Sequence, residues 1–263
     1  MEGRFLSNCS SRREEALKSV WLEPRHLGCY ESAKSAGQGT TRGFSATDLL
    51  VTLAVVSLLA AVVVPMVVRS KAKSRLELCQ SNVKQVTRAV LEFAGEHEQT
   101  LPKMEGSPVP GGWWHYKEQV KGYLGLNGPP SIADKVFACP DDRGYDDGVD
   151  KPQPFSRSKK HNYTSYVFNG VNLPGVPNIG GRTLASIKQP SRTLLVMEWT
   201  AHAPLSWHSS LTRRANTPFY NDAQSVVGFV DGHVAYVKIY YDGINAAYTR
   251  DPVPGYDYQY GGD

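Results

Sequence analysis

One long run of apolar residues interrupts an otherwise mixed sequence. Residues 49–68 read LLVTLAVVSLLAAVVVPMVV, which is twenty residues without a charged side chain. At a rise of about 1.5 Å per residue, a helix of this length spans roughly 30 Å, the thickness of the hydrocarbon core of a bilayer. A core helix of a soluble protein usually carries polar residues on one face, so the run predicts a membrane-spanning helix.

The apolar pattern changes after this run but does not end. Apolar residues continue at alternating spacings of four and three, which is the stripe of an amphipathic helix: Ala72, Leu76, Cys79, Val83, Val86, Val90 and Phe93. Charged residues lie between them, and Gly95 follows the stripe as a helix stop. We therefore expect one long helix within residues 44–97, with its first half, including the transmembrane segment 49–68, in lipid and its second half on a sheet.

The rest of the chain carries loop and strand signals. Glycine, proline and aspartate are frequent between Glu98 and Lys160, apart from a short helical stretch at residues 116–124. Aromatic and β-branched residues predict strands in four later segments: residues 163–169, 193–199, 225–230 and 234–241. Asp231-Gly232 between the last two is the signal of a two-residue hairpin turn. These patterns predict an α+β domain over residues 98–250, with an antiparallel sheet against the long helix, and a C-terminal tail over residues 251–263.

Composition adds little to this picture. Charged residues make up 21% of the 263 residues and the formal net charge is only +4, so the chain gives no reason to expect a nucleic-acid partner. Residues 1–43 hold seven basic and five acidic side chains and no apolar run. They therefore differ from a secretory signal peptide, which has a short apolar core, and are expected to form a cytoplasmic leader.

The junction between leader and apolar run has a distinctive order of residues. Gly43 precedes Phe44, Asp48 stands at the start of the run, and Pro65 lies inside it. Glycine lets a protease approach the backbone closely, and a carboxylate at the edge of a membrane span is costly enough to suggest a function. Ser45 and Asp48 also fit a helix capping box, which needs no further role for the acid.

This junction resembles the processing site of type IV pilins and of the pseudopilins of type II secretion. The resemblance implies that a prepilin peptidase cuts after Gly43 and that the new N-terminal Phe44 is methylated. It also implies that Asp48, at the fifth mature position where the family most often has glutamate, pairs with the free amino terminus of a neighbouring subunit. Pro65 falls at the twenty-second mature position, where many pilins carry a helix-bending proline.

Later motifs extend the resemblance to a bacterial subfamily of pilin-like proteins over about residues 42–241. They are Cys79-x-x-Asn82-x-Lys84-Gln85, Phe137-x-Cys139-Pro140-x-Asp142, Ser165-Tyr166-x-x-Asn169, Pro190-Ser191-x-Thr193 through Glu198, and Phe229-x-Asp231-Gly232-His233. The subfamily carries a His-x9-Asp-Gly signature near its C-terminus. The Asp-Gly pair is present here, but Asn221 stands at the histidine position, so no role of that histidine carries over.

The resemblance implies a structural subunit of a type II secretion or type IV pilus-like filament. Such a subunit is held in the bacterial inner membrane by a single span, with its C-terminal domain in the periplasm or outside the cell. Its partners are other subunits of the filament and the prepilin peptidase. The positive-inside rule favours the opposite orientation, because four basic residues after the span outnumber two before it: Arg69, Lys71, Lys73 and Arg75 against Lys34 and Arg42. We follow the processing motif because it is the more specific signal.

Four cysteines divide between the two parts of the chain. Cys9 and Cys29 lie in the leader, whereas Cys79 and Cys139 are the only pair in the mature part. A bridge between the second pair would close about sixty residues and stabilise the fold by roughly 4 kcal/mol. Two buried free thiols are the alternative, since Cys79 lies on the apolar stripe.

No catalytic or metal-binding motif is visible. The chain has no zinc spacing, nucleophile elbow, phosphate loop or dinucleotide fingerprint, so no catalytic residue, metal site or cofactor is predicted. His202, His208 and His233 lie near acidic residues in the sequence and invite a metal or acid-base hypothesis; these acids are Glu198, Asp222 and Asp231. Such scattered histidines are more often exposed polar residues. Asp141-Asp142 and Asp146-Asp147 lack the regular order of a calcium loop. The alternatives to a filament-forming subunit are a minor or tip pilin that binds a ligand and a membrane-anchored enzyme.

Overall fold

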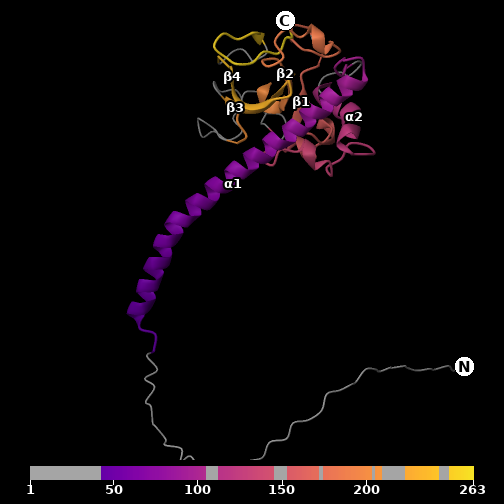
Figure 1. Cartoon of the computed structure of the whole chain (residues 1–263). Helices are drawn as coiled ribbons and strands as arrows, with labels where there is room; N and C mark the ends of the chain where they lie inside the picture. The colour runs from indigo at the N-terminus through magenta and orange to yellow at the C-terminus, as the bar shows by residue number, and fades with distance from the viewer. Residues whose placement is uncertain are drawn as a thin grey trace, which may run out of the picture. The chain divides into compact units, whose positions relative to one another are not determined.

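The computed structural model describes seven stretches of the chain: residues 43–104, 112–144, 153–171, 174–202, 205–208, 223–242 and 249–263. The chain divides into two compact units, Met1–Leu53 and Ala54–Asp263, and the boundary falls within the first helix. The second unit holds every strand that the structure describes (Figure 1).

Helix α1 (Ala46–Glu96) is continuous over 51 residues, with Pro65 inside it, which confirms the prediction of one long helix. It contains a stretch long and apolar enough to cross a membrane, and none of that stretch is buried in the chain's own fold. The large apolar side chains between Leu49 and Val68 are 44–72% exposed. Burial begins further along the helix, at residues on one face: Cys79, Asn82, Val83, Val86, Thr87, Ala89, Val90 and Ala94.

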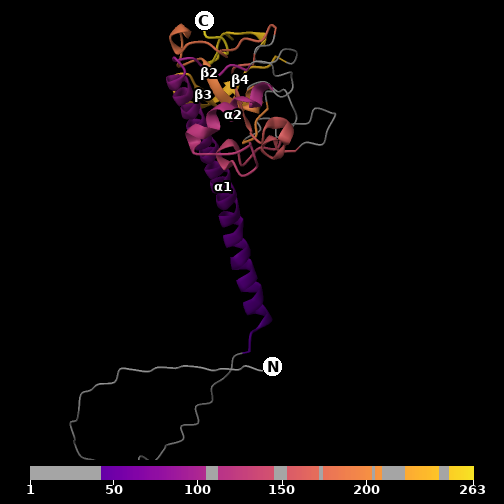
Figure 2. The same ribbon diagram turned by 90° about the vertical axis from the view of Figure 1, so that its right-hand side faces the viewer.

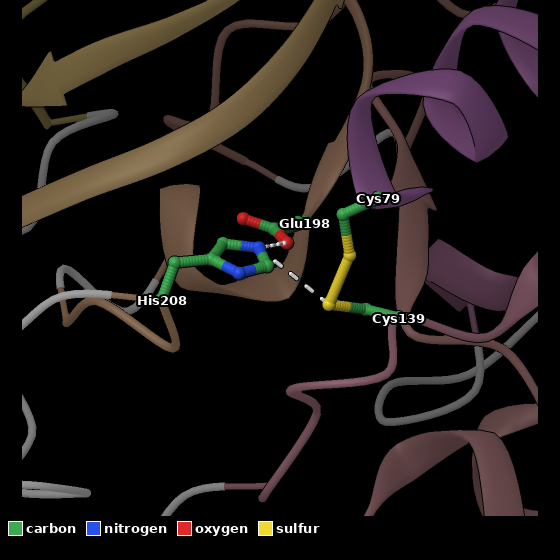
Figure 3. Close-up of side chains that lie close together, drawn as sticks. All are labelled: Cys79, Cys139, Glu198 and His208. Carbon is green, nitrogen blue, oxygen red and sulfur yellow. Dashed lines mark hydrogen bonds and ion pairs between the residues drawn. A yellow bond between two sulfur atoms is a disulfide. The ribbon is translucent and has the colours of Figure 1, made fainter. Parts of the chain in front are cut away.

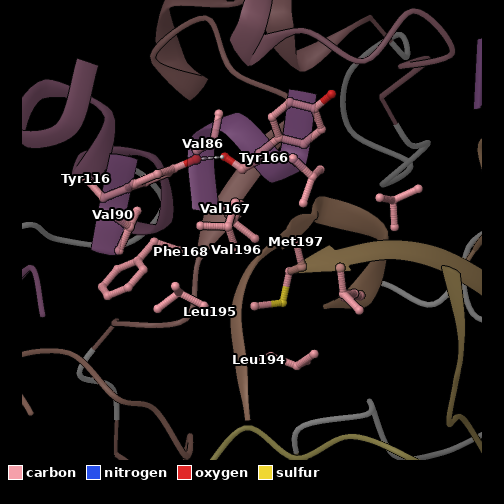
Figure 4. Close-up of a cluster of buried hydrophobic side chains, with 14 of the residues drawn as sticks. Val86, Val90, Tyr116, Tyr166, Val167, Phe168, Leu194, Leu195, Val196 and Met197 are labelled. Carbon is pink, nitrogen blue, oxygen red and sulfur yellow. Dashed lines mark hydrogen bonds between the residues drawn. The ribbon is translucent and has the colours of Figure 1, made fainter. Parts of the chain in front are cut away.

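An antiparallel sheet of four strands, in the order β1-β2-β3-β4, receives the buried face of α1. The strands are β1 (Tyr166–Phe168), β2 (Leu194–Glu198), β3 (Ala223–Phe229) and β4 (Val234–Ile239). Each overlaps a segment that its aromatic and β-branched residues predict to be a strand, so the α+β class is confirmed. Figures 1 and 2 both show the later part of α1 beside the sheet, and Figure 4 shows valines of α1 packed with β1 and β2.

Short helices fill the connections around this core. The predicted helical stretch at 116–124 is confirmed as α2 (Tyr116–Val120), which continues directly into a 3-10 turn (Lys121–Leu124). The remaining 3-10 turns in the described residues are Gly112–Trp114, Lys135–Phe137, Phe155–Arg157, Lys159–His161, Leu184–Ser186 and Trp199–Ala201. Tyr116 of α2 is fully buried, so α2 contributes directly to the core.

The hairpin between β3 and β4 is one residue longer than Asp231-Gly232 alone predicts. Phe229 N–H donates to His233 O, and Gly232 N–H donates to Phe229 O, each at 2.9 Å. Gly232 has a φ of 90°, which favours glycine over any residue with a side chain. The turn therefore spans Val230 to Gly232, a three-residue loop whose last residue is left-handed.

The C-terminal segment set apart as a tail is built into the domain. Gln259 forms a parallel bridge with Thr193, the residue before β2, and Leu194 N–H donates to Gln259 O at 2.9 Å. Tyr258 and Tyr260 on either side are fully buried. Such irregular backbone gives no alternation in the sequence, so its burial is visible only in the fold.

β3 approaches α1 so closely at Gly228 that a methyl group there would overlap Thr87 Oγ1 and lie 3.2 Å from Thr87 Cβ. Gly228→Ala is therefore expected to lower the free energy of unfolding by about 1–3 kcal/mol through overpacking, measured by urea denaturation. Thr87 Oγ1 has no hydrogen-bond partner among the described residues, so Thr87→Ala removes the nearest atom without breaking a hydrogen bond. The double variant is expected to recover part of the loss, and no recovery would contradict this explanation.

Candidate functional site

The residues at the predicted cut are open to approach. Phe44 is 80% exposed, and a Cβ placed on Gly43 would meet no atom within 4 Å. Both residues precede the first turn of α1 in non-helical backbone. The leader itself, residues 1–42, lies outside the described residues.

Asp48 lies in the first turn of α1 and caps it. Ser45 N–H donates to Asp48 Oδ2 at 3.1 Å, and Thr47 N–H donates to Ser45 Oγ at 3.3 Å. These contacts match a capping box, except that Ser45 Oγ accepts the N–H of Thr47 and not that of Asp48, one residue further on. Asp48 is exposed, so the same carboxylate is accessible to another group.

Cys79 and Cys139 are joined by a disulfide. The sequence alone allows either this bridge or two buried free thiols. Their Cα atoms lie 5.2 Å apart, and the two residues are 0% and 3% exposed. The bond ties the first buried position of α1 to the loop that follows the Lys135–Phe137 turn (Figure 3).

A buried acid and imidazole lie beside this disulfide (Figure 3). Glu198, the last residue of β2, is 0% exposed. Its Oε1 accepts a hydrogen bond from His208 Nε2 at 2.8 Å, and its Oε2 accepts one from Val226 N–H at 2.8 Å. His208 Nε2 also lies 3.6 Å from Cys139 Sγ. The imidazole thus bridges the buried carboxylate and the sulfur.

The chain of charges continues from His208 to the surface of α1. His208 Nδ1 donates to Asp141 Oδ2 at 2.9 Å, and Arg75 Nε donates to Asp141 Oδ1 at 2.6 Å. The side chains of His208 and Asp141 are 3% and 16% exposed, whereas that of Arg75 is 46% exposed. Acid and base alternate along the four residues, so each buried charge faces an opposite one.

Charge pairing has a larger effect than burial on the pKa values of His208 and Asp141. Burial by itself lowers the pKa of His208, but hydrogen bonds and charges from Asp141 and Glu198 raise it to about 9. Burial likewise raises the pKa of Asp141, and His208 and Arg75 reverse the effect and leave that pKa below its ordinary value. His208 is therefore an imidazolium at neutral pH.

The interpretation of the three histidines as exposed is wrong for two of them. His208 is buried in the charge chain, and His202 is 5% exposed, with burial lowering its pKa to about 3. His233 agrees with the interpretation, since its side chain is 45% exposed and bonds Asp231 at 2.6 Å. The closeness of His208 to Glu198 in the sequence is one sign of the cluster, whereas Cys79 and Cys139 lie far from both along the chain.

The acidic pairs considered for calcium have other partners where the structure describes them. Asp141 bonds His208 and Arg75. The carboxylate of Asp142 accepts hydrogen bonds from the backbone N–H groups of Gly144, Phe155 and Ser156. It also accepts one from the hydroxyl of Ser165. Asp146-Asp147, Asn221 and Asp222 lie outside the described residues.

Among the described residues, one group has metal-ligand character. Cys79, Cys139, Glu198 and His208 each bring one donor atom, and these atoms all lie within 4.8 Å of one another. Glu198 and His208 are closed to solvent, so a substrate does not reach them in this conformation. No family model, curated protein or solved structure matches the chain. The functional assignment therefore rests on the residues and their geometry.

Proposed function

We propose that the chain is a membrane-anchored filament subunit of the pilin or pseudopilin class, cut after Gly43 by a prepilin peptidase. The observation that carries the proposal is α1 itself. One uninterrupted helix combines an apolar, exposed part with a part whose residues enter the core of an α+β domain. A subunit of this class needs both, because the first part lies in lipid before assembly and against other helices afterwards.

The exposed part of α1 requires an apolar environment. Burying one leucine or valine side chain is worth about 1.5–3 kcal/mol, and every large apolar residue between Leu49 and Val68 is left at least 44% exposed by the fold. Exposed apolar surface on this scale marks a membrane or an assembly interface. The bilayer and the filament are two environments that cover the same residues in turn.

Asp48 is the proposed contact between subunits. An ionised carboxylate has about four acceptor sites, so the bond from Ser45 N–H leaves room for an ammonium group. The amino terminus of a neighbouring subunit, freed by the cut before Phe44, supplies that group. Pairing the two charges neutralises both where water is excluded and sets the register of packed helices.

The disulfide supports placing the domain outside the cytoplasm. Structural disulfides persist in the periplasm and outside the cell and are rare in the cytoplasm. Cys79 and Cys139 are bonded within the domain. This favours the orientation implied by the processing motif over the one favoured by the basic residues after the span. We therefore propose a single-pass protein of the bacterial inner membrane.

Mass spectrometry of the natively expressed protein tests the proposal. The expected mature N-terminus is a methylated Phe44, and co-expression with a prepilin peptidase should produce the same cut. An N-terminus at Met1, or a cut after the apolar run, would overturn the assignment. Gly43→Val is the matched variant, because it changes only the residue before the bond, and it is expected to leave the precursor uncut.

Asp48 can be tested separately from the cut. Asp48→Ala is expected to leave processing intact and to abolish incorporation into filaments, scored by shearing and immunoblotting. Asp48→Asn keeps an oxygen that accepts from Ser45 N–H but removes the charge. Loss of assembly in both variants supports the charge pair. Normal assembly of Asp48→Asn would reduce the residue to a helix cap.

A further inference from the structure

The two disulfide cysteines and the two side chains beside them together offer four metal-ligand atoms, two of which a disulfide alone does not need. We propose that Cys79, Cys139, His208 and Glu198 bind one zinc ion when the disulfide is reduced. Their donor atoms already lie within 4.8 Å of one another and come from distant parts of the sequence (Figure 3). The inference does not depend on the proposed filament role.

The distances fit a zinc ion with small movements. Tetrahedral zinc holds sulfur at about 2.3 Å and nitrogen or oxygen at about 2.0–2.2 Å, which places its ligands roughly 3.3–3.8 Å from one another. Cys139 Sγ and His208 Nε2 are already 3.6 Å apart. Glu198 Oε1 and His208 Nε2, now 2.8 Å apart across a hydrogen bond, must separate slightly. The two sulfur atoms separate once their bond is broken.

The groups that orient the ligands are also in place. Asp141 accepts from His208 Nδ1 at 2.9 Å, which leaves Nε2 as the metal-binding nitrogen, and Arg75 holds Asp141 in turn. A carboxylate behind a ligating histidine is the usual outer partner in zinc sites. Val226 N–H holds Glu198 Oε2, so that Oε1 remains for the metal.

The donor set favours zinc over other ions. Two thiolates with an imidazole suit zinc, whereas magnesium and calcium prefer sites made of oxygen atoms. All four ligands come from the protein and are buried or nearly so, which is the pattern of a structural site. The ion would therefore connect α1 to β2 when the covalent bond is absent.

Reduction of the disulfide precedes zinc binding. Two molecules of a small thiol, or one of a phosphine with water, reduce the disulfide to two cysteine thiols and are themselves oxidised. Zinc then displaces both thiol protons and the proton on His208 Nε2. In the oxidised structure this nitrogen lies between Glu198 Oε1 and Cys139 Sγ. Binding releases three protons, and the two thiolates, the carboxylate and the ion leave the site with one negative charge. Asp141 and Arg75 balance each other behind it.

The test uses the full chain in detergent, with Cys9→Ser and Cys29→Ser in every sample so that no other thiol binds metal. Protein reduced with a phosphine without denaturant is mixed with zinc and desalted, and its zinc is measured by native mass spectrometry. One ion per reduced chain and none per oxidised chain is expected. Cobalt(II) in place of zinc should give the thiolate charge-transfer band, and a cobalt complex without this band overturns the proposal.

Substitutions assign the ligands. His208→Gln and Glu198→Gln leave both cysteines in place and are each expected to weaken zinc binding more than tenfold. Asp141→Asn changes only the outer partner and is expected to weaken it about 10–100-fold. The control is His97→Gln, because His97 lies in the turn directly after α1, away from the site, and its Nδ1 contacts Phe93 O. Failure of the reduced chain to bind zinc, or equal affinity in His208→Gln and His97→Gln, overturns the proposal.

Discussion

Replacing His208 with alanine is expected to lower the free energy of unfolding of the oxidised protein by about 3–5 kcal/mol. The imidazolium lies between Glu198, which is 0% exposed, and Asp141. Its removal leaves Glu198 as a buried charge with no cation beside it, and Arg75 still pairs with Asp141. Urea denaturation in detergent, followed by tryptophan fluorescence, measures the loss.

Two further variants separate charge from packing. Adding Glu198→Gln to His208→Ala is expected to restore part of the stability, because glutamine carries no charge and still accepts from Val226 N–H. His233→Ala is the matched control, since His233 forms an exposed pair with Asp231 and its loss should cost about 1 kcal/mol or less. A cost for His208→Ala no larger than for His233→Ala would show that the buried charges contribute little.

The parts of the fold that the sequence predicts are those encoded by local patterns of residues. The stripe from Ala72 to Phe93 places every third or fourth side chain on one face, and this periodicity alone predicts where α1 enters the core. Runs of aromatic and β-branched residues likewise predict β2 and β3, although their ends shift by one or two residues. These signals depend only on neighbours along the chain.

The charge cluster depends on contacts that no local pattern encodes. Glu198 stands at the end of a strand that reads as apolar, and His208 follows in a loop-rich stretch where exposed histidines are the usual finding. The disulfide joins α1 to the loop that holds Asp141, and His208 reaches Glu198 and Asp141 from another loop. The burial of the C-terminal segment could not be predicted either, because Gln259 bonds Thr193, which lies sixty-six positions away in the sequence.

The stability of the oxidised protein is expected to depend on pH between about 6.5 and 9. The pKa of His208 is 6.5 in its ordinary state and about 9 in the fold, where Glu198 of β2 and Asp141 of the loop face it. Arg75 of α1 acts through Asp141, and the ring of Tyr236 on β4 lies 6.0 Å away. The folded state therefore binds more protons than the unfolded state in this window, so the free energy of unfolding falls as pH rises.

This stabilisation is complete below pH 6.5 and lost above pH 9, and its size is about 3 kcal/mol. Lys117 acts in the opposite direction above pH 8, because burial lowers its pKa to about 8 and its unfolded form holds the proton longer. His208→Gln isolates the histidine, since it leaves Lys117 unchanged. Urea midpoints measured with a chelator present should fall across the window in the parent protein and much less in the variant. Parallel curves would mean that His208 is not the group that titrates, because no other change separates the two proteins.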